Sequence, residues 1–455
     1  MSVPADLPLT VLRRRRSMQL AYWNGALFAI GKGLASTPLV IYLSMELAER
    51  FAIRNAAWGI GLILAAPQLV GVLRLGAPAL IGRLARRKEF CVAAYLGSGL
   101  MLLALPMTIA PGCLPSSDAV LAVLAGVWCA YNLLEFLGEV ALWSWLADLA
   151  PLAVRGRFLG RRERWMAAGQ AAAMLSSGLF VWGCHESCRW LPGWTPYAIA
   201  VALGAGMLIA AIVPLLGMPA ATGATVGPRN RALRTAEPTG SGSDAGKLDL
   251  SPFADRRFRR LLVLGCWLAL CTGLTEAPQN AFPKWGLGIG LLTMLALKVG
   301  LRLGQWTIST QVGRWTDRLG NRPVLACSLL LVAQGPVFYF LSTPAQPWWL
   351  AGAWLVWIAW VGVNIGIPNL LLKLAPPRAN LSYIATYFAV TGLCVGLSTI
   401  AGGRLFDCYR YWTWIFLGWE LNYYQIAFLL GWITRSLGVL LLLWVSEDRQ
   451  GPVTQ

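Results

Sequence analysis

Two glutamates and an asparagine lie at helical spacing within a segment that is otherwise apolar. The stretch NLLEFLGE, residues 132–139, carries Asn132, Glu135 and Glu139 three and four residues apart. In a helix these spacings bring side chains to one face. An ionised side chain in the hydrocarbon layer costs at least about 3 kcal/mol, so such residues normally face a bundle interior or a water-filled path. The stripe predicts a polar site inside a membrane protein, where an acid can take up and release a proton.

Lys32 is the candidate partner for this stripe. It lies about thirteen residues into one expected helix, and Glu135 lies about twelve residues before the end of another; at about 1.5 Å per residue the two reach nearly the same depth. Contact between Lys32 and Glu135 then requires the two helices to be neighbours, which the family resemblance given below implies. Two interpretations remain open. The charges form a substrate or proton site, or they form a structural ion pair that fixes helix packing.

The composition places the chain in a membrane. It has 455 residues, of which 57% are hydrophobic and 13% charged, with a mean hydropathy of +0.59. A helix crosses the hydrocarbon layer with about 20 apolar residues. We expect an all-α protein with twelve transmembrane helices, at 19–47, 57–82, 90–110, 119–147, 164–183, 197–217, 261–283, 287–312, 323–342, 348–373, 383–401 and 423–445.

The net charge of +18 is explained by topology rather than by a nucleic acid partner. With the amino terminus inside, most Lys and Arg residues fall in cytoplasmic segments, beginning with residues 13–16, as the positive-inside rule requires. The first apolar run is too long for a cleavable signal peptide. We therefore expect a multi-pass protein of a bacterial inner membrane, with both termini cytoplasmic and no bound nucleic acid.

A polar linker divides the chain into two similar halves. We expect a cytoplasmic N-terminus at 1–18, six-helix bundles at 19–218 and 258–447, a cytoplasmic linker at 219–257 and a tail at 448–455. GKGLASTP and CTGLTEAP, RLG and RLG, and DLAP and KLAP recur in the same order in both halves, which indicates a duplicated unit. The repeat places Asn364 opposite Glu139, as a neutral candidate for the site.

The second half offers a polar face of its own. Glu276 is flanked in the sequence by Thr272 and Gln279. Lys298 and Arg302, four residues apart in the next expected helix, are candidate counter-charges. We include Thr272, Glu276, Gln279 and Lys298 with Lys32, Asn132, Glu135, Glu139 and Asn364 as substrate- or proton-binding candidates.

The stretch GRWTDRLGNRPVL, residues 313–325, resembles the signature loop of the major facilitator superfamily. The pattern is met at Gly313, Asp317, Arg318, Gly320 and Arg322, with Asn321 in place of one basic residue. DLAPLAVRGRFLGRR, residues 148–162, is similar to the family's loop between helices 4 and 5. Together with twelve spans in two halves, this resemblance implies the major facilitator fold and transport by alternating access.

The resemblance also implies a conformational latch between the halves. Gly313 would let two helices approach closely, and Asp317 would bind an arginine at the start of helix 5, where Arg161, Arg162 and Arg164 are available. Arg318 would belong to the same turn; a plain turn cap is the alternative reading. In the first half Gly82 is retained, but Arg86 stands where the family has Asp. We therefore expect the second-half loop to hold the molecule.

The remaining features exclude several function classes. Gly25–Gly33 in GALFAIGKG has the wrong spacing for a phosphate loop, and no Ser-His or HExxH pattern supports an enzyme. Cys184, His185 and Cys188 supply too few ligands for a metal; a disulfide that involves Cys113 or Cys408, or unpaired thiols, remain open. We expect a monomeric secondary transporter of a small solute, with proton coupling as a hypothesis and no cofactor or metal. The alternative is a transport-inactive sensor or scaffold on the same fold.

Overall fold

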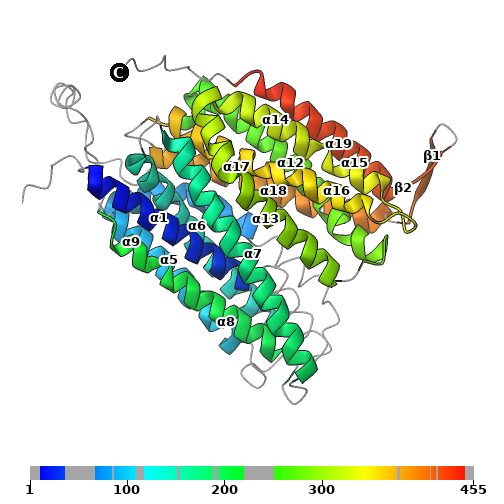
Figure 1. The fold of residues 1–455 in the computed structure, drawn as a ribbon, viewed down its shortest axis with the longest axis horizontal. Helices are drawn as coiled ribbons and strands as arrows, with labels where there is room; N and C mark the ends of the chain where they lie inside the picture. The colour runs from blue at the N-terminus through cyan, green and yellow to red at the C-terminus, as the bar shows by residue number, and fades with distance from the viewer. Residues whose placement is uncertain are drawn as a thin grey trace, which may run out of the picture.

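The computed structural model is a bundle of long helices that run roughly side by side (Figure 1). It describes residues 11–35, 67–84, 87–108, 117–150, 154–187, 192, 194–219, 251–289, 291–376, 380–409, 411–416 and 419–445. Eight of the described segments are helices long and apolar enough to cross a membrane. Each of the expected spans overlaps a described helix, although parts of the first two, residues 36–47 and 57–66, lie outside the described residues.

The helices before residue 220 form one group, which we call the first bundle. Its elements, in chain order, are α1 (Val11–Leu34), η1 (Gly71–Gly76), α4 (Ala77–Leu84), α5 (Arg87–Thr108), α6 (Ser117–Leu149), α7 (Arg155–Ser187), α8 (Thr195–Ala210) and α9 (Ile212–Leu216).

The helices after residue 250 form the second bundle, coloured green to red in Figure 1. Its elements are α11 (Ser251–Ala254), α12 (Arg256–Trp285), α13 (Leu291–Leu319), α14 (Asn321–Ala333), α15 (Gly335–Leu341), α16 (Trp349–Val356), η3 (Trp357–Ala359), α17 (Trp360–Leu374), α18 (Asn380–Tyr409), β1 (Thr413–Phe416), β2 (Trp419–Asn422) and α19 (Tyr423–Leu442).

Local chemistry explains where several helices begin. The Asp255 carboxylate accepts hydrogen bonds from the amides of Arg257 and Phe258, which caps α12. Asn422 and Gln425 form a reciprocal capping box at the start of α19. Gly320, with φ of 93°, separates α13 from α14 in a conformation that a residue with a side chain rarely adopts.

The two bundles share one apolar core at one end and have separate cores at the other. Residues from both bundles, including Leu149, Phe158, Val312 and Ile384, belong to a single buried cluster. At the end where the β1–β2 hairpin lies, the first bundle buries a cluster around Trp128, while the second buries its own cluster. We call the end with the shared core the Asp317 end and the end with separate cores the hairpin end.

Several boundaries differ from the sequence-based expectations. Helix α1 begins at Val11, inside the predicted N-terminal extension, and α11 and the start of α12 fall inside the predicted linker. Helix α7 begins at Arg155 rather than 164, and α13 continues to Leu319 rather than 312. A hydropathy pattern predicts that a helix ends where charged residues begin. The backbone nevertheless stays helical beyond the apolar layer, because water and neighbouring helix ends solvate the charged side chains there. Residues 1–10, 220–250 and 446–455 lie outside the described residues.

Candidate functional site

Lys32 and Glu135 form a close ion pair between α1 and α6. The Lys32 Nζ lies 2.8 Å from Glu135 Oε1 and 2.7 Å from Oε2, and it donates to the Tyr131 hydroxyl at 3.2 Å. The side chain of Glu135 is 7% exposed, whereas that of Lys32 is 33% exposed. The contact expected from helix depth is therefore present, with the carboxylate inside the first bundle and the ammonium partly open.

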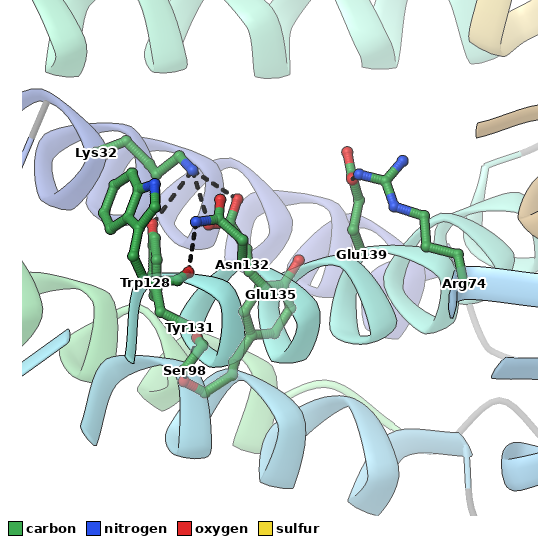
Figure 2. A network of polar contacts seen from close by, with 9 residues as sticks. Lys32, Arg74, Ser98, Trp128, Tyr131, Asn132, Glu135 and Glu139 are labelled. Atoms are coloured by element: carbon green, nitrogen blue, oxygen red, sulfur yellow. Dashed lines mark hydrogen bonds and ion pairs between the residues drawn. The ribbon is translucent and has the colours of Figure 1, made fainter. Parts of the chain in front are cut away.

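Glu139 has a partner that the sequence analysis did not assign. Arg74 Nη2 lies 3.6 Å from Glu139 Oε2, and the Trp143 indole donates to Oε1 at 3.4 Å. Figure 2 shows Asn132, Glu135 and Glu139 leaving α6 on the side of Lys32 and Arg74. Arg74 is 8% exposed, so it does not extend to a surface. The feature of the sequence that pointed to Arg74 was the RLG motif, which occurs in both halves of the chain.

The guanidinium of Arg74 also links the two bundles. Its Cζ lies 3.6 Å from the centroid of the Phe136 ring in α6 and 5.6 Å from that of Phe388 in α18. Cation–π contacts of this kind contribute most when they are shielded from water. The Glu139 carboxylate, 34% exposed, therefore sits beside a junction between the bundles.

Asn132 shares the stripe with the glutamates but has a local partner. Its side-chain amide donates to the Trp128 carbonyl four residues earlier at 2.8 Å, and the residue is buried. This bond satisfies the amide within α6 itself.

The polar face of the second bundle forms a separate group. Glu276 Oε2 accepts a hydrogen bond from Thr399 at 2.8 Å, and the Thr272 carbonyl accepts one from Thr275. Gln279 Oε1 lies 3.4 Å from a guanidinium nitrogen of Arg435, a buried arginine in α19 that also donates to Thr275. No described contact joins Glu276 to Lys32 or Glu135.

Asn364 faces the first bundle through Glu163, an acid that the sequence analysis did not select. The Asn364 amide donates to Glu163 Oε1 at 3.3 Å, which joins α17 to α7. Arg302 donates to Gln305 at 2.7 Å, and within the described residues Lys298 makes no ion pair. Glu163 is hard to select from the sequence because it lies in an arginine-rich stretch whose pattern predicts a loop.

Asp317 joins the last turn of α13 to the first turn of α7. Its carboxylate accepts hydrogen bonds from the backbone amides of Gly156 at 2.7 Å and Arg157 at 2.9 Å, and from Arg157 Nε at 3.3 Å. The carboxylate side chain is 6% exposed. Burial raises the pKa of Asp317, although its hydrogen bonds with Arg157 and Gly156 act in the opposite direction.

The expected arginine partners of Asp317 were wrong. Arg157 occupies that place because α7 begins at Arg155, so its free amides lie about two turns before the predicted start. Arg161 instead lies close to Tyr22, and Arg162 lies over the Trp143 ring at 5.6 Å. Arg318 is exposed and lines a small hollow beside Asp317.

Glycines allow α7 and α13 to touch at the Asp317 end. A Cβ on Gly156 would lie 2.6 Å from the Gly313 carbonyl oxygen, and one on Gly160 would lie 2.5 Å from the Ser309 carbonyl oxygen. A Cβ on Gly313 would in turn meet the Gly156 carbonyl. The close approach expected at Gly313 is therefore present, and it depends on glycines in both helices.

A hydrogen bond between Ser144 and Asn380, at 2.9 Å, also joins the bundles, from α6 to α18. The corresponding first-half turn, with Arg86, lies outside the described residues. Nearby, Arg87 pairs with Asp148 at 2.8 Å within the first bundle.

The cysteines form no disulfide among the described residues. Cys184 and Cys408 are unpaired thiols, whereas Cys113 and Cys188 lie outside the described part. Among the described residues no three His, Cys, Asp or Glu side chains are placed to hold a metal ion.

Solved transporter structures share this architecture. A proton:xylose symporter bound to 6-bromo-6-deoxy-D-glucose, described as a major facilitator superfamily protein, matches with a TM-score of 0.67 and 15% identity over 96% of each chain. The human organic anion transporter MFSD10 matches with a TM-score of 0.65 and 15% identity over 94% of this chain and 99% of that one. The E. coli fucose:proton symporter matches at 0.61 and 12%, over 94% and 98%.

No family model and no curated protein sequence matches the chain, so the relationship is carried by structure. The similarity spans both bundles of this chain and nearly the whole of each solved transporter. The chain therefore has the fold of the major facilitator superfamily transporters.

Proposed function

We propose that this protein is a secondary transporter that moves a small solute by alternating access between its two bundles. The observation that carries the proposal is the row of charges Lys32, Glu135, Glu139 and Arg74 on α1, α6 and η1, which reaches the junction with α18. Of these elements, α6 is long and apolar enough to cross a membrane. Charges at this depth are normally kept only where they border a solute or ion path. The fold shared with two proton symporters and an anion transporter supports the same conclusion.

The shared core at the Asp317 end and the separate cores at the hairpin end support a state closed at the former. The Asp317 contact with α7 is the latch of this state. In the proposed cycle the α7–α13 contact opens when the hairpin ends of the bundles approach each other. We place the Asp317 end and both termini in the cytoplasm of a bacterial cell, and the chain acts as a monomer.

Proton coupling is assigned to the acids of α6. Glu139 is partly exposed, and its neighbours Arg74 and Trp143 can hold the carboxylate when it is charged. Protonation would release Arg74, whose contact with Phe388 reaches the second bundle. The solute class that suits carboxylates, cations and the amides of Asn364 and Gln279 includes zwitterions, sugars and organic ions.

Uptake into proteoliposomes tests this function. A panel of such solutes is offered with and without an imposed pH gradient, to the wild-type protein and to Glu135→Gln and Glu139→Gln. We expect saturable uptake of at least one solute, driven by the gradient, and loss of that drive in the variants. Glu420→Gln, in the exposed hairpin, is the matched control and should retain uptake.

If both α6 variants keep gradient-driven uptake, the coupling assignment is wrong. If no solute enters above the level of empty vesicles while the panel still stabilises the protein on heating, the chain is a transport-inactive sensor. These two failures are distinguishable because only the second leaves the wild-type protein without flux.

A further inference from the structure

A groove on the side of the molecule lies where the two bundles meet. It is lined by α1 and α7 of the first bundle and by α13 of the second, and its volume is about 860 Å³. Figure 1 shows α7 running between α1 and α13. The groove is separate from the Lys32–Glu135 pair, because none of its lining residues belongs to the charged row.

One part of the groove is strongly basic. Arg161 and Arg164 of α7 and Arg314 of α13 line it, and all three side chains are exposed. Arg314 lies beside the first turn of α7, since Gly313 contacts Gly156. The lining contains no Asp or Glu, and the neighbouring Asp317 is bound to the amides of α7. An anionic group here would meet three cations without a competing carboxylate.

The rest of the groove is apolar and continues along the same helices. From Arg161 to Leu175 the helix rises about 21 Å, at about 1.5 Å per residue. One leaflet of the hydrocarbon layer is about 15 Å thick, half of about 30 Å. The apolar part is therefore long enough for an acyl chain, and its walls include Ala168, Ala172, Leu175, Val299 and Leu303.

A polar group lies between the basic and apolar parts. Thr310 lines the groove, and its buried hydroxyl has no hydrogen-bond partner among the described residues. A glycerol or ester oxygen of a lipid would lie at this level, just below a phosphate held by the arginines.

We propose that this groove binds an anionic phospholipid, with its phosphate at Arg161, Arg164 and Arg314 and one acyl chain along α7 and α13. A soluble phosphate would use only the basic part, and a neutral lipid only the apolar part. Because α7 and α13 belong to different bundles, the bound lipid holds this conformation together. The site is independent of the solute and of the coupling ion.

Lipid binding is measured on the full-length protein by native mass spectrometry and by thermal stability in nanodiscs. The lipids are phosphatidylglycerol and phosphatidylcholine with the same acyl chains, and the readout is the preference for the anionic lipid. Each of the three arginines attracts an anionic phosphate, so we expect R161Q/R164Q/R314Q to lower this preference at least about tenfold. The control R15Q/R256Q/R259Q removes three other exposed arginines and should keep it.

A second variant tests the apolar part without changing any charge. Ala172 is exposed in the groove, so Ala172→Trp fills the space of the acyl chain while the arginines remain. We expect it to lose the lipid adduct and the extra thermal stability. Inorganic phosphate and glycerol phosphate, added without lipid, should give neither effect. Retained preference in either groove variant, equal loss in the control, or full replacement by soluble phosphate would overturn the proposal.

Discussion

Replacement of Lys32 by Met should destabilise the protein more than replacement of Glu135 by Gln. Lys32 is the only ion-pair partner of the Glu135 carboxylate within the described residues, and it contacts both oxygens. Without it, a carboxylate that is 7% exposed is left uncompensated. Such a loss costs about 3–5 kcal/mol for fully buried pairs. We expect about 3 kcal/mol, because the one-third exposed Lys32 is already partly hydrated.

Glu135→Gln removes the negative charge of the buried carboxylate and leaves the ammonium of Lys32, which is partly exposed to water. The Gln carbonyl and the Tyr131 hydroxyl still accept hydrogen bonds from Lys32. We expect a cost of about 1 kcal/mol, comparable to one ordinary hydrogen bond. The double variant should cost no more than Glu135→Gln alone, since neither charge remains. The cycle then gives a coupling of at least about 3 kcal/mol between the two sites.

Unfolding in mixed micelles, followed by the fluorescence of the 23 tryptophans, measures these differences. Arg259→Met, at an exposed position in α12, serves as the control and should change the free energy of unfolding by less than about 0.5 kcal/mol. Additive effects in the double variant, or a smaller loss in Lys32→Met than in Glu135→Gln, would refute the reasoning.

Three further predictions concern the junction between the bundles. Gly156→Ala places a Cβ 2.5 Å from Asp317 Oδ1, so it should weaken the α7–α13 contact by about 1–3 kcal/mol. Gly183→Ala in the same helix places its Cβ in open space, so this control should be neutral or stabilising. Inter-bundle distances and thermal stability measure both effects. Burial raises the pKa of Asp317, so the closed state binds a proton more readily than a separated state with the ordinary pKa of about 3.9. The contact should strengthen as pH falls through that raised pKa and weaken above it, and Asp317→Asn should remove this dependence of the inter-bundle distance on pH. Arg74→Gln should lower solute uptake in proteoliposomes while Arg259→Gln leaves it unchanged, and equal uptake in both would show that Arg74 has only a packing role.

The sequence predicted the parts of the fold and site that depend on helix periodicity. Counting residues along two helices placed Lys32 and Glu135 at the same depth, because depth in a membrane is proportional to residue number, and the family resemblance placed the two helices side by side. Arg74 was not selected as a site residue, because its contact with Glu139 joins η1 to α6, which are far apart in the sequence. A single sequence carries no measure of that distance.

The contact of Asp317 shows the same limit. The family resemblance identified Asp317 and the helix that binds it, α7, but not its partner Arg157. The start of α7 had been predicted at its first apolar turn, which lies after Arg157. The β1–β2 hairpin was likewise missed: its strands are only four residues long and lie in what reads as an outer loop. The groove at Arg161 could not be found from sequence, since it requires α7 and α13 to be adjacent.

Pulsed distance measurements between spin labels in the two bundles test alternating access most directly. One pair is placed at the hairpin end, at Ser187 and Thr343, and the other at the Asp317 end, at Glu89 and Arg259, in a chain without its native cysteines; all four positions are exposed. When Gly156→Ala weakens the α7–α13 contact, or when a transported solute is added, the account predicts that the distance at the Asp317 end lengthens while that at the hairpin end shortens. Distances that stay fixed, or that change in the same direction, would contradict it.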